Sequence, residues 1–426
     1  MKIRIGVIGL ACLFVSCLQA QDTLQTERLK LFVDCKQDCD LTFLRSEMSI
    51  VDFVIDNKAA DVFILITSLE NGGGGKQFQL ITSGQNNFKD VGTDTIKFNT
   101  KPNATDFEIR QDLSRQIKIT LLPFLSKTQS INDVAISFKP VETENKDGSA
   151  AVTKDRWNYW VFNINASGDL NRDVVYQSFN QTGKVSASRI TDKLKVSFTT
   201  TLKNTRSGFE LVDSSGAKKI VVKNYDYNFN HQAVKSLSEH WSYGYEAAVS
   251  RSNFSNNKLR LRFNPAIEYD IFPYKSVNTK FLTIRYGVDI QRNSYYDTTV
   301  FNKTQELLYG QGLTVYMSLK QKWGSTAVSL NYHNYLHNPK LYYAGMTVNV
   351  DVRITGNISF TVKAYGGLVR DQIALVKTKA SDQDVLVRRR QVASSYNYWS
   401  NFGINYRFGS KLNNFVNPRF DEIPDD

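Results

Sequence analysis

The most constraining feature of this chain is an alternation of apolar and polar residues at every second position. It is clearest near the end of the sequence, where the apolar positions are Tyr396, Tyr398, Phe402, Ile404, Tyr406 and Phe408. A period of two places successive side chains on opposite faces of a β-strand. Many earlier segments share the pattern, so their apolar faces need a common apolar surrounding. A closed barrel in an outer membrane provides one, because lipid covers the outside and the lumen is polar.

The alternating segments predict about twelve strands, an even number that suits a bacterial single-chain barrel. We expect each to belong to a strand of the roughly 9–11 residues that a tilted membrane strand needs. Besides 396–408 and the weaker segments 176–190 and 221–229, they are 160–164, 194–198, 241–249, 259–271, 282–290, 313–319, 328–332, 342–354 and 358–368. We therefore expect a mainly β protein: an antiparallel transmembrane β-barrel preceded by a small α/β periplasmic domain.

The connections between these segments alternate in length. Tight turns are expected at 191–193, 237–240, 272–275, 323–325 and 355–357, and longer polar loops at 204–218, 293–304 and 371–391. Outer-membrane barrels have short periplasmic turns and longer outer loops. This parity predicts that the N-terminal domain lies in the periplasm.

The N-terminus indicates export. Lys2 and Arg4 precede an apolar run, and Leu18-Gln19-Ala20 precedes Gln21, so residues 1–20 are typical of a signal peptide. Phe14-Val15-Ser16-Cys17 is a partial lipobox, which leaves lipidation of Cys17 as an alternative. The formal charge of +12 favours contact with outer-membrane lipid and lipopolysaccharide, and no motif for nucleic-acid binding is evident.

The first part of the mature chain predicts a separate α/β domain over residues 21–126. Asp40 is a candidate N-cap for a short helix, and Thr105 to Glu108 forms a capping box for a second helix that should end near Pro123. The expected strands are 29–33, 51–55, 62–68, 77–83 and 95–98, with a further short strand at 134–138. We expect a linker over 127–156, the barrel over 157–410 and a periplasmic tail over 411–426.

Cys35 and Cys39 are the cysteines that remain after signal cleavage. In an exported protein, this spacing favours a local disulfide between strand and helix. No additional His or Cys lies nearby to complete a metal site, and we expect no metal and no cofactor.

Charged residues on the polar side of the alternation should line the lumen. They are Glu246, Arg260, Arg262, Glu268, Asp270, Arg285, Asp289, Lys320, Asp351, Arg353 and Lys363. Twelve strands lie between barrels filled by side chains and barrels that leave a channel. The charges therefore allow two interpretations: a cross-linked plug, or a narrow polar pore whose charges set its preference.

The histidines offer little support for catalysis. His333 points to the lumen by parity, and His240 falls in a short turn. His337 lies in an outer loop, where it could pair with a carboxylate, but no Gly-x-Ser-x-Gly motif marks a nucleophile. A hydrolase is the third hypothesis, and our expectation is that the chain is not an enzyme.

The chain resembles a family. The signal peptide, the Cys35 to Cys39 turn, the glycine loop 72–75 and the endings 406–410 and 413–420 carry the resemblance. They are similar to the largely uncharacterised outer-membrane β-barrel proteins of the Bacteroidota that carry a small N-terminal periplasmic domain. The resemblance implies location and architecture and supplies no catalytic residues.

The first functional hypothesis is therefore an envelope scaffold or assembly protein, whose periplasmic domain binds another periplasmic or envelope protein. The alternative is a small-solute pore or transporter gated by the N-terminal domain.

Overall fold

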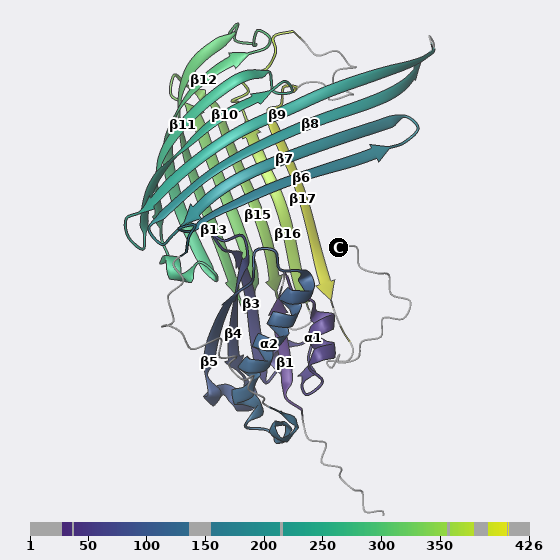
Figure 1. Cartoon of the computed structure of the whole chain (residues 1–426), viewed down its shortest axis with the longest axis vertical. Helices are drawn as coiled ribbons and strands as arrows, with labels where there is room; N and C mark the ends of the chain where they lie inside the picture. Colours follow the sequence, from purple (N-terminus) through teal and green to yellow (C-terminus); the bar gives the residue numbers. More distant parts are fainter. Residues whose placement is uncertain are drawn as a thin grey trace, which may run out of the picture.

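The computed structural model has two parts, a small α/β domain and a large curved β-sheet (Figure 1). It describes residues 28–35, 38–135, 155–213, 216–355, 358–378, 391–406 and 408. The expected signal peptide, Cys17, most of the linker and the tail 411–426 lie outside these residues. Among the described helices, none has the length and apolar character needed to span a membrane.

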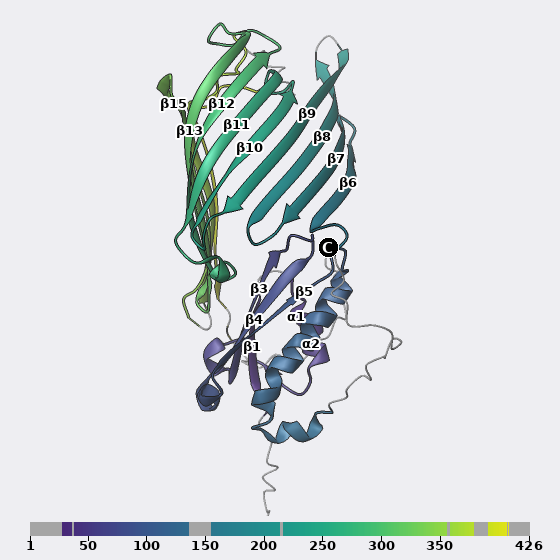
Figure 2. The same ribbon diagram turned by 60° about the vertical axis from the view of Figure 1, so that its left-hand side comes forward.

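The small domain is a five-stranded sheet with two helices on one face (Figure 2). Its strand order is β2-β1-β3-β4-β5; β1 is parallel to β2 and β3, and the remaining pairs are antiparallel. The strands are β1 Lys30–Cys35, β2 Asp52–Phe53, β3 Val62–Glu70, β4 Lys76–Gly84 and β5 Thr93–Asn99, and the helices are α1 Leu41–Glu47 and α2 Asp106–Leu125.

Local sequence signals explain both helix starts. The Asp40 carboxylate accepts the Phe43 N–H at 2.8 Å, and Thr105 and Glu108 form a reciprocal capping box. The second helix was expected to end near Pro123, and α2 ends two residues later, at Leu125. A proline removes one N–H and restricts its predecessor, which the final turn of this helix accommodates.

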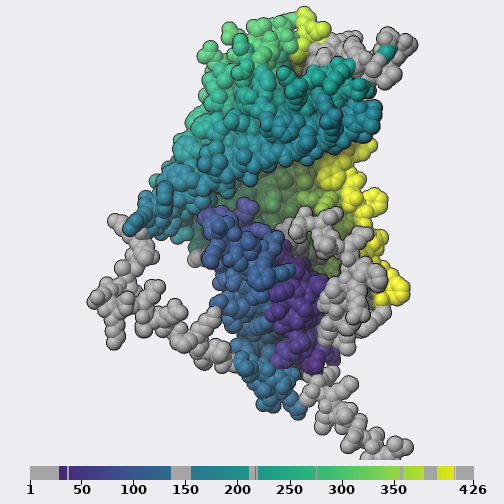
Figure 3. Space-filling model, turned by 45° about the vertical axis from the view of Figure 1, so that its right-hand side comes forward, coloured from purple at the N-terminus to yellow at the C-terminus, as the bar shows by residue number. Residues whose placement is uncertain are grey.

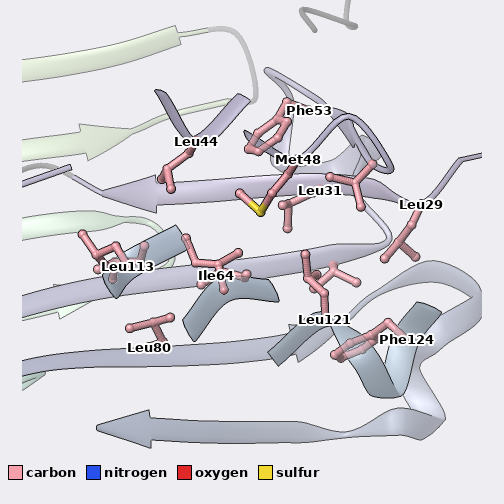
Figure 4. Close-up of a cluster of buried hydrophobic side chains, with 14 of the residues drawn as sticks. Leu29, Leu31, Leu44, Met48, Phe53, Ile64, Leu80, Leu113, Leu121 and Phe124 are labelled. Atoms are coloured by element: carbon pink, nitrogen blue, oxygen red, sulfur yellow. The ribbon is translucent and has the colours of Figure 1, made fainter. Parts of the chain in front are cut away.

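A hydrophobic core lies between the helices and the sheet (Figure 4). Its fully buried members include Leu31, Ile64, Leu80, Leu113 and Ile117. Val134 packs against the same core, so the domain extends beyond the expected boundary at residue 126. The expected strand at 134–138 is absent at 134 and 135, and 136–138 lie outside the described residues.

A disulfide between Cys35 and Cys39 joins the end of β1 to the start of α1, with a Cα–Cα distance of 6.2 Å. The bond therefore anchors the first helix to a central strand of the small domain.

The large sheet has twelve antiparallel strands in sequence order from β6 to β17, which confirms the predicted number. The strands are β6 Trp160–Arg172, β7 Tyr176–Ile190, β8 Leu194–Asp213, β9 Gly216–Ser236, β10 Trp241–Ser252, β11 Asn257–Asp270, β12 Lys280–Tyr295, β13 Gln305–Gln321, β14 Gly324–Tyr335, β15 Asn338–Arg353, β16 Ile358–Val369 and β17 Tyr396–Tyr406. The sheet curls but is not closed, because no described residue of β6 pairs with β17 (Figure 2).

One expected loop is wrong. Residues 204–218 were predicted to be a long polar loop, but β8 and β9 continue as one hairpin as far as Asp213 opposite Gly216. The period of two weakens there because polar residues occupy both faces, while the backbone pairing continues. The loops 293–304 and 371–391 do fall largely between strands, but the tight turn expected at 272–275 is a nine-residue connection over 271–279 that contains a 3-10 turn.

The outer face of the large sheet carries a continuous apolar row. Through the strand ladders, it passes along Ile267, Tyr286, Leu313, Tyr332, Ala344, Leu368 and Tyr396. Ile267 is 45% exposed, Leu313 41% and Tyr396 62%. A water-soluble protein rarely exposes so long an apolar stripe.

The same row also shows how strongly the strands are staggered. It continues through Tyr243 and Lys235 to Leu194. Tyr396 begins β17 at the end of the sheet far from the small domain, whereas Leu194 begins β8 at the end next to it. We call these the far end and the near end. A stagger of this kind is what closing a sheet into a barrel requires.

Candidate functional site

The inner face of the large sheet contains a polar chamber of about 580 Å³. Small residues form part of its wall, because one lateral row runs through Gly244, Ala266, Gly287 and Gly312 to His333. Positions without long side chains leave space between the charged rows above and below. The chamber thus arises from the register of four adjacent strands, β10 to β13.

The structure divides the predicted lumen charges among three places. Glu246, Arg260, Arg262, Glu268, Arg285 and Asp289 line the chamber. Lys320, Asp351 and Lys363 line a second cavity of about 690 Å³, which also includes Asp34 and Ser68 of the small domain. Asp270 and Arg353 lie at the near end, where the His240 ring contacts the Asp270 carbonyl and Arg353 contacts the small domain.

A chain of hydrogen bonds fixes one side of the chamber. Arg260 donates from Nε and Nη2 to Gln291 Oε1 at 3.1 and 2.6 Å, and Gln291 Nε2 donates to Asp289 Oδ2 at 2.5 Å. The other carboxylate oxygen, Asp289 Oδ1, lies 2.8 Å from His333 Nε2. Asp289 and Gln291 are almost completely buried. The network therefore holds these side chains against the wall and leaves the chamber beside them open.

Gly310 makes the contact between Asp289 and His333 feasible. Gly310 lies on β13, between β12, which carries Asp289, and β14, which carries His333, and it pairs with Asp289 in the ladder. A Cβ atom built there would lie 2.5 Å from His333 Nε2 and 2.7 Å from Asp289 Oδ1. Neither this pair nor the row of small residues was predicted, because both depend on ladder registers rather than on residue spacing.

Most charges in the chamber lack a direct ionic partner. In the part of the chain that the structure describes, no arginine–carboxylate pair within 4.0 Å occurs there, and His333–Asp289 is the one histidine–carboxylate contact. Arg262 Nε is buried without a hydrogen-bond partner. With the Asn264 amide oriented to accept, Arg262 Nη2 donates to it at 3.0 Å. A fully cross-linked plug of charges is therefore not the observed arrangement.

The small domain lies against the near end of the large sheet (Figure 3). Residues on the face of its sheet opposite the helices make the contacts. Arg353 Nη2 lies 3.2 Å from Asp34 Oδ2, and the guanidinium carbon is 4.8 Å from the centre of the Phe32 ring. Lys322 donates to Ser83 Oγ at 2.7 Å and lies over Phe63.

A third near-end turn completes these contacts, since Asn278 Nδ2 donates to Gln79 at 2.7 Å. Turns from three different hairpins therefore hold the domain in place.

Asp38 adds an electrostatic contribution at this interface. Burial would raise the pKa of its carboxyl, but hydrogen bonds from Lys76 and Ser68 and the charges of Lys76 and Lys320 lower it below the usual 3.8. Because Lys320 belongs to β13, the carboxylate interacts with both parts of the molecule.

The structure gives no support to a catalytic role for His337. Its ring packs against Tyr335 with the centroids 5.8 Å apart, and no hydrogen bond from His337 to a carboxylate occurs among the described residues. A search of those residues for three or more clustered metal-ligating side chains finds none.

Comparisons with known proteins add little to this description. No protein-family model and no curated protein matches the chain. A solved structure of the NanC porin in a rhombohedral crystal form aligns at 10% identity, covering 55% of this chain and 98% of the porin chain, with a TM-score of 0.26. At that TM-score, the similarity does not establish a shared fold or function.

Proposed function

We propose that this chain is an outer-membrane β-barrel that admits small polar solutes to a lumenal chamber, with its N-terminal domain covering the periplasmic mouth. The observation that carries the proposal is the chamber of about 580 Å³ on the polar side of a sheet whose other side is apolar. Sites for small molecules commonly have volumes of about 300–1,000 Å³. We therefore favour the hypothesis of a small-solute pore over that of a scaffold with a plugged lumen.

The apolar row supports the membrane location. Lipid is the solvent in which side chains such as Ile267, Leu313 and Leu368 can remain outward-facing without a protein partner. Four of the five near-end connections span two to four residues, but far-end connections such as 173–175 and 336–337 are equally short. The long far-end connection over 370–395 is therefore what supports a periplasmic orientation for the small domain, because the longer loops of such barrels face outward. Membership of the Bacteroidota family remains part of this proposal.

The charges in the chamber favour neutral or zwitterionic solutes. The basic residues Lys195, Arg260, Arg262 and Arg285 are matched in number by the acidic residues Glu246, Glu268, Asp289 and Asp371. Rings of a single sign select ions of the opposite sign. A balanced lining gives no such preference, while its amides and arginines can hydrogen-bond hydroxyl, carbonyl and carboxylate groups.

A change in the chamber wall tests the proposal directly. A Cβ at Gly312 would meet the Tyr332 carbonyl at 3.2 Å and His333 Cδ2 at 3.9 Å, so a small shift accommodates a larger side chain. We expect Gly312→Leu to project into the chamber and reduce the swelling rate of proteoliposomes in small sugars and zwitterionic amino acids by at least about fivefold.

Gly366→Leu is the matched control. A Cβ there has no neighbour within 4 Å, and Gly366 lines an apolar groove on the outer face with Leu313 and Met346. The same added side chain should leave solute flux unchanged. Equal flux through Gly312→Leu and the unmodified protein, with both folded and inserted, would remove the chamber from the solute path.

A scaffold remains the second candidate because the small domain has surfaces that the large sheet does not cover. Strand β5 pairs only with β4 among the described residues, and Phe107 on α2 is 56% exposed. An exposed strand edge can accept a strand from a partner. Photo-crosslinkers placed at Thr95 and Phe107 in cells should capture the same envelope protein if this candidate is correct, and the absence of any adduct at both sites would count against it.

A further inference from the structure

The segment after β16 crosses the far end of the large sheet. We call residues 370–377 the strap. It leaves β16 and reaches the loop between β12 and β13. In the sheet, the strands β15, β14 and β13 lie between β16 and β12. Val300 N donates to the Leu375 carbonyl at 2.8 Å, and Lys377 N donates to the Thr298 carbonyl at 2.9 Å. The strap therefore pairs with a loop that belongs to a distant part of the rim.

Side-chain packing places the strap against the inner face of the large sheet. Ile373 is 6% exposed and packs in a cluster with Leu308, Tyr335 and Leu341. Tyr335 also lines the chamber, as does Asp371 of the strap itself. The strap thus forms part of the far wall of the chamber instead of projecting away from the sheet.

Asn256 organises the attachment. Its backbone has φ of 59°, and its side-chain Nδ2 donates to the carbonyls of Asp297 and Ala374, both at 2.9 Å. Its Oδ1 accepts the Asp297 N–H at 2.8 Å. One asparagine in the turn between β10 and β11 therefore ties the strap to the β12–β13 loop, and the hydrogen bonds that it makes are all directed at backbone atoms.

We propose that the strap is the outer gate of the chamber and must swing away from the β12–β13 loop for a solute to enter. This inference rests on the proposed function, because it assigns a regulatory role at the same chamber. The strap closes the far end while the small domain covers the near end, so the chamber lies between two separately attached covers. The contacts between the strap and the β12–β13 loop are one bridge at Thr299 and Val376 and the hydrogen bond from Lys377 Nζ to Asn302. These, the Asn256 hydrogen bond to the strap and the Ile373 cluster must break for the strap to move.

A disulfide across the bridge tests the gate. Thr299 and Val376 form an antiparallel bridge in which the flanking residues make the hydrogen bonds. Residues opposed in this way have Cα atoms about 4.5 Å apart, within the range that a disulfide spans. In the full chain carrying Thr299→Cys and Val376→Cys, oxidation should lock the strap and reduce solute swelling at least about fivefold, and a reductant should restore the rate.

Loosening the strap should have the opposite effect. Asn256→Gly keeps the left-handed backbone accessible but removes the side-chain bonds, so we expect flux to rise at least about twofold. The control is Asn158→Gly, which makes the same change at another positive-φ asparagine, near the start of β6 and away from the strap.

The outcomes separate the gate from the function. Flux that is insensitive to the verified disulfide and to Asn256→Gly, in a protein that otherwise passes solute, would overturn the gate alone. The absence of flux in every form, including the reduced and Asn256→Gly proteins, would overturn the proposed function and the gate with it.

Discussion

Replacing Arg353 by methionine should loosen the small domain from the large sheet. The substitution keeps the length of the side chain but leaves Asp34 without its cationic partner. The Asp34 side chain is 5% exposed and that of Arg353 is 15% exposed, so the pair is largely shielded from water. Removing one partner of a buried ion pair costs about 3–5 kcal/mol, and the lost contact with Phe32 adds about 0.5–1 kcal/mol.

The partial exposure of Arg353 places the expected cost near the lower end, at about 3 kcal/mol. Since about 1.4 kcal/mol corresponds to a factor of ten, opening of the interface should become roughly 100-fold more favourable. Amide hydrogen exchange of β1 and β3, followed by mass spectrometry in the native state, measures this opening.

Two comparisons make the measurement specific. The double variant Arg353→Met/Asp34→Asn should exchange more slowly than the sum of the single effects predicts, because both changes remove the same pair. Arg189→Met is the matched control: Arg189 also lies at the near end but donates to Asn158 within the large sheet, and it should change exchange in the small domain by no more than about twofold. If Arg353→Met accelerates exchange no more than Arg189→Met does, the pair does not hold the domain.

Three further predictions follow from other parts of the structure. Asp38 has a lowered pKa in the folded protein, so its stabilising effect is complete above the unfolded value near 3.8 and is lost as the pH falls through the folded value. Because its main partners, Lys76 and Ser68, belong to the same domain, Asp38→Asn should weaken the acid dependence of the stability of the small domain, measured by hydrogen exchange between pH 5 and pH 2. Breaking the disulfide with Cys35→Ser/Cys39→Ser should destabilise the small domain by about 2 kcal/mol in urea unfolding, because the closed loop is short; no change in the midpoint would contradict this. For twelve strands tilted by about 35–45°, closure requires a stagger of roughly 12–17 residues. Through the strand ladders, this stagger places Asn405 of β17 opposite Val161, Asn163 or Asn165 of β6. Asn405→Cys should therefore form an intramolecular disulfide with Val161→Cys, Asn163→Cys or Asn165→Cys but not with Asn171→Cys. Exclusively intermolecular products in all of these pairs would refute closure between these strands.

The alternation in the sequence was sufficient to predict the strand number because each strand has one apolar and one polar face. Tyr396, Ile404 and Tyr406 show this directly, because they pair with the apolar residues Leu368, Phe360 and Ile358 of β16. The helix starts at Asp40 and Thr105 were also predictable, since capping depends on residues only three positions apart. The hairpin beyond Asn204 was not predictable in this way. Polar residues occupy both of its faces, so the sequence lacks the alternation there, and only the backbone pairing identifies the strands.

The chamber illustrates a different limit. Parity predicted that Arg262, Glu268 and Asp289 share one face, but it could not tell how the strands slide past each other. Only the register brings Gly310 between Asp289 and His333. Parity likewise assigned Arg353 to the lumen, whereas its position at the end of β15 lets it reach Asp34 from a domain more than three hundred residues earlier in the chain.

The central claim is that the chamber forms part of a solute path across a membrane. Its most direct test is single-channel conductance in planar bilayers of Arg353→Met/Asn256→Gly, in which the covers at both ends are loosened, and of the same protein with Gly312→Leu added. We expect the first protein to give discrete conductance steps, because both of its covers are loosened, and the second to give steps at most about half as large, because a side chain projects into the path. Steps of equal size in both proteins, or silence in both when they are folded and inserted, would contradict the account.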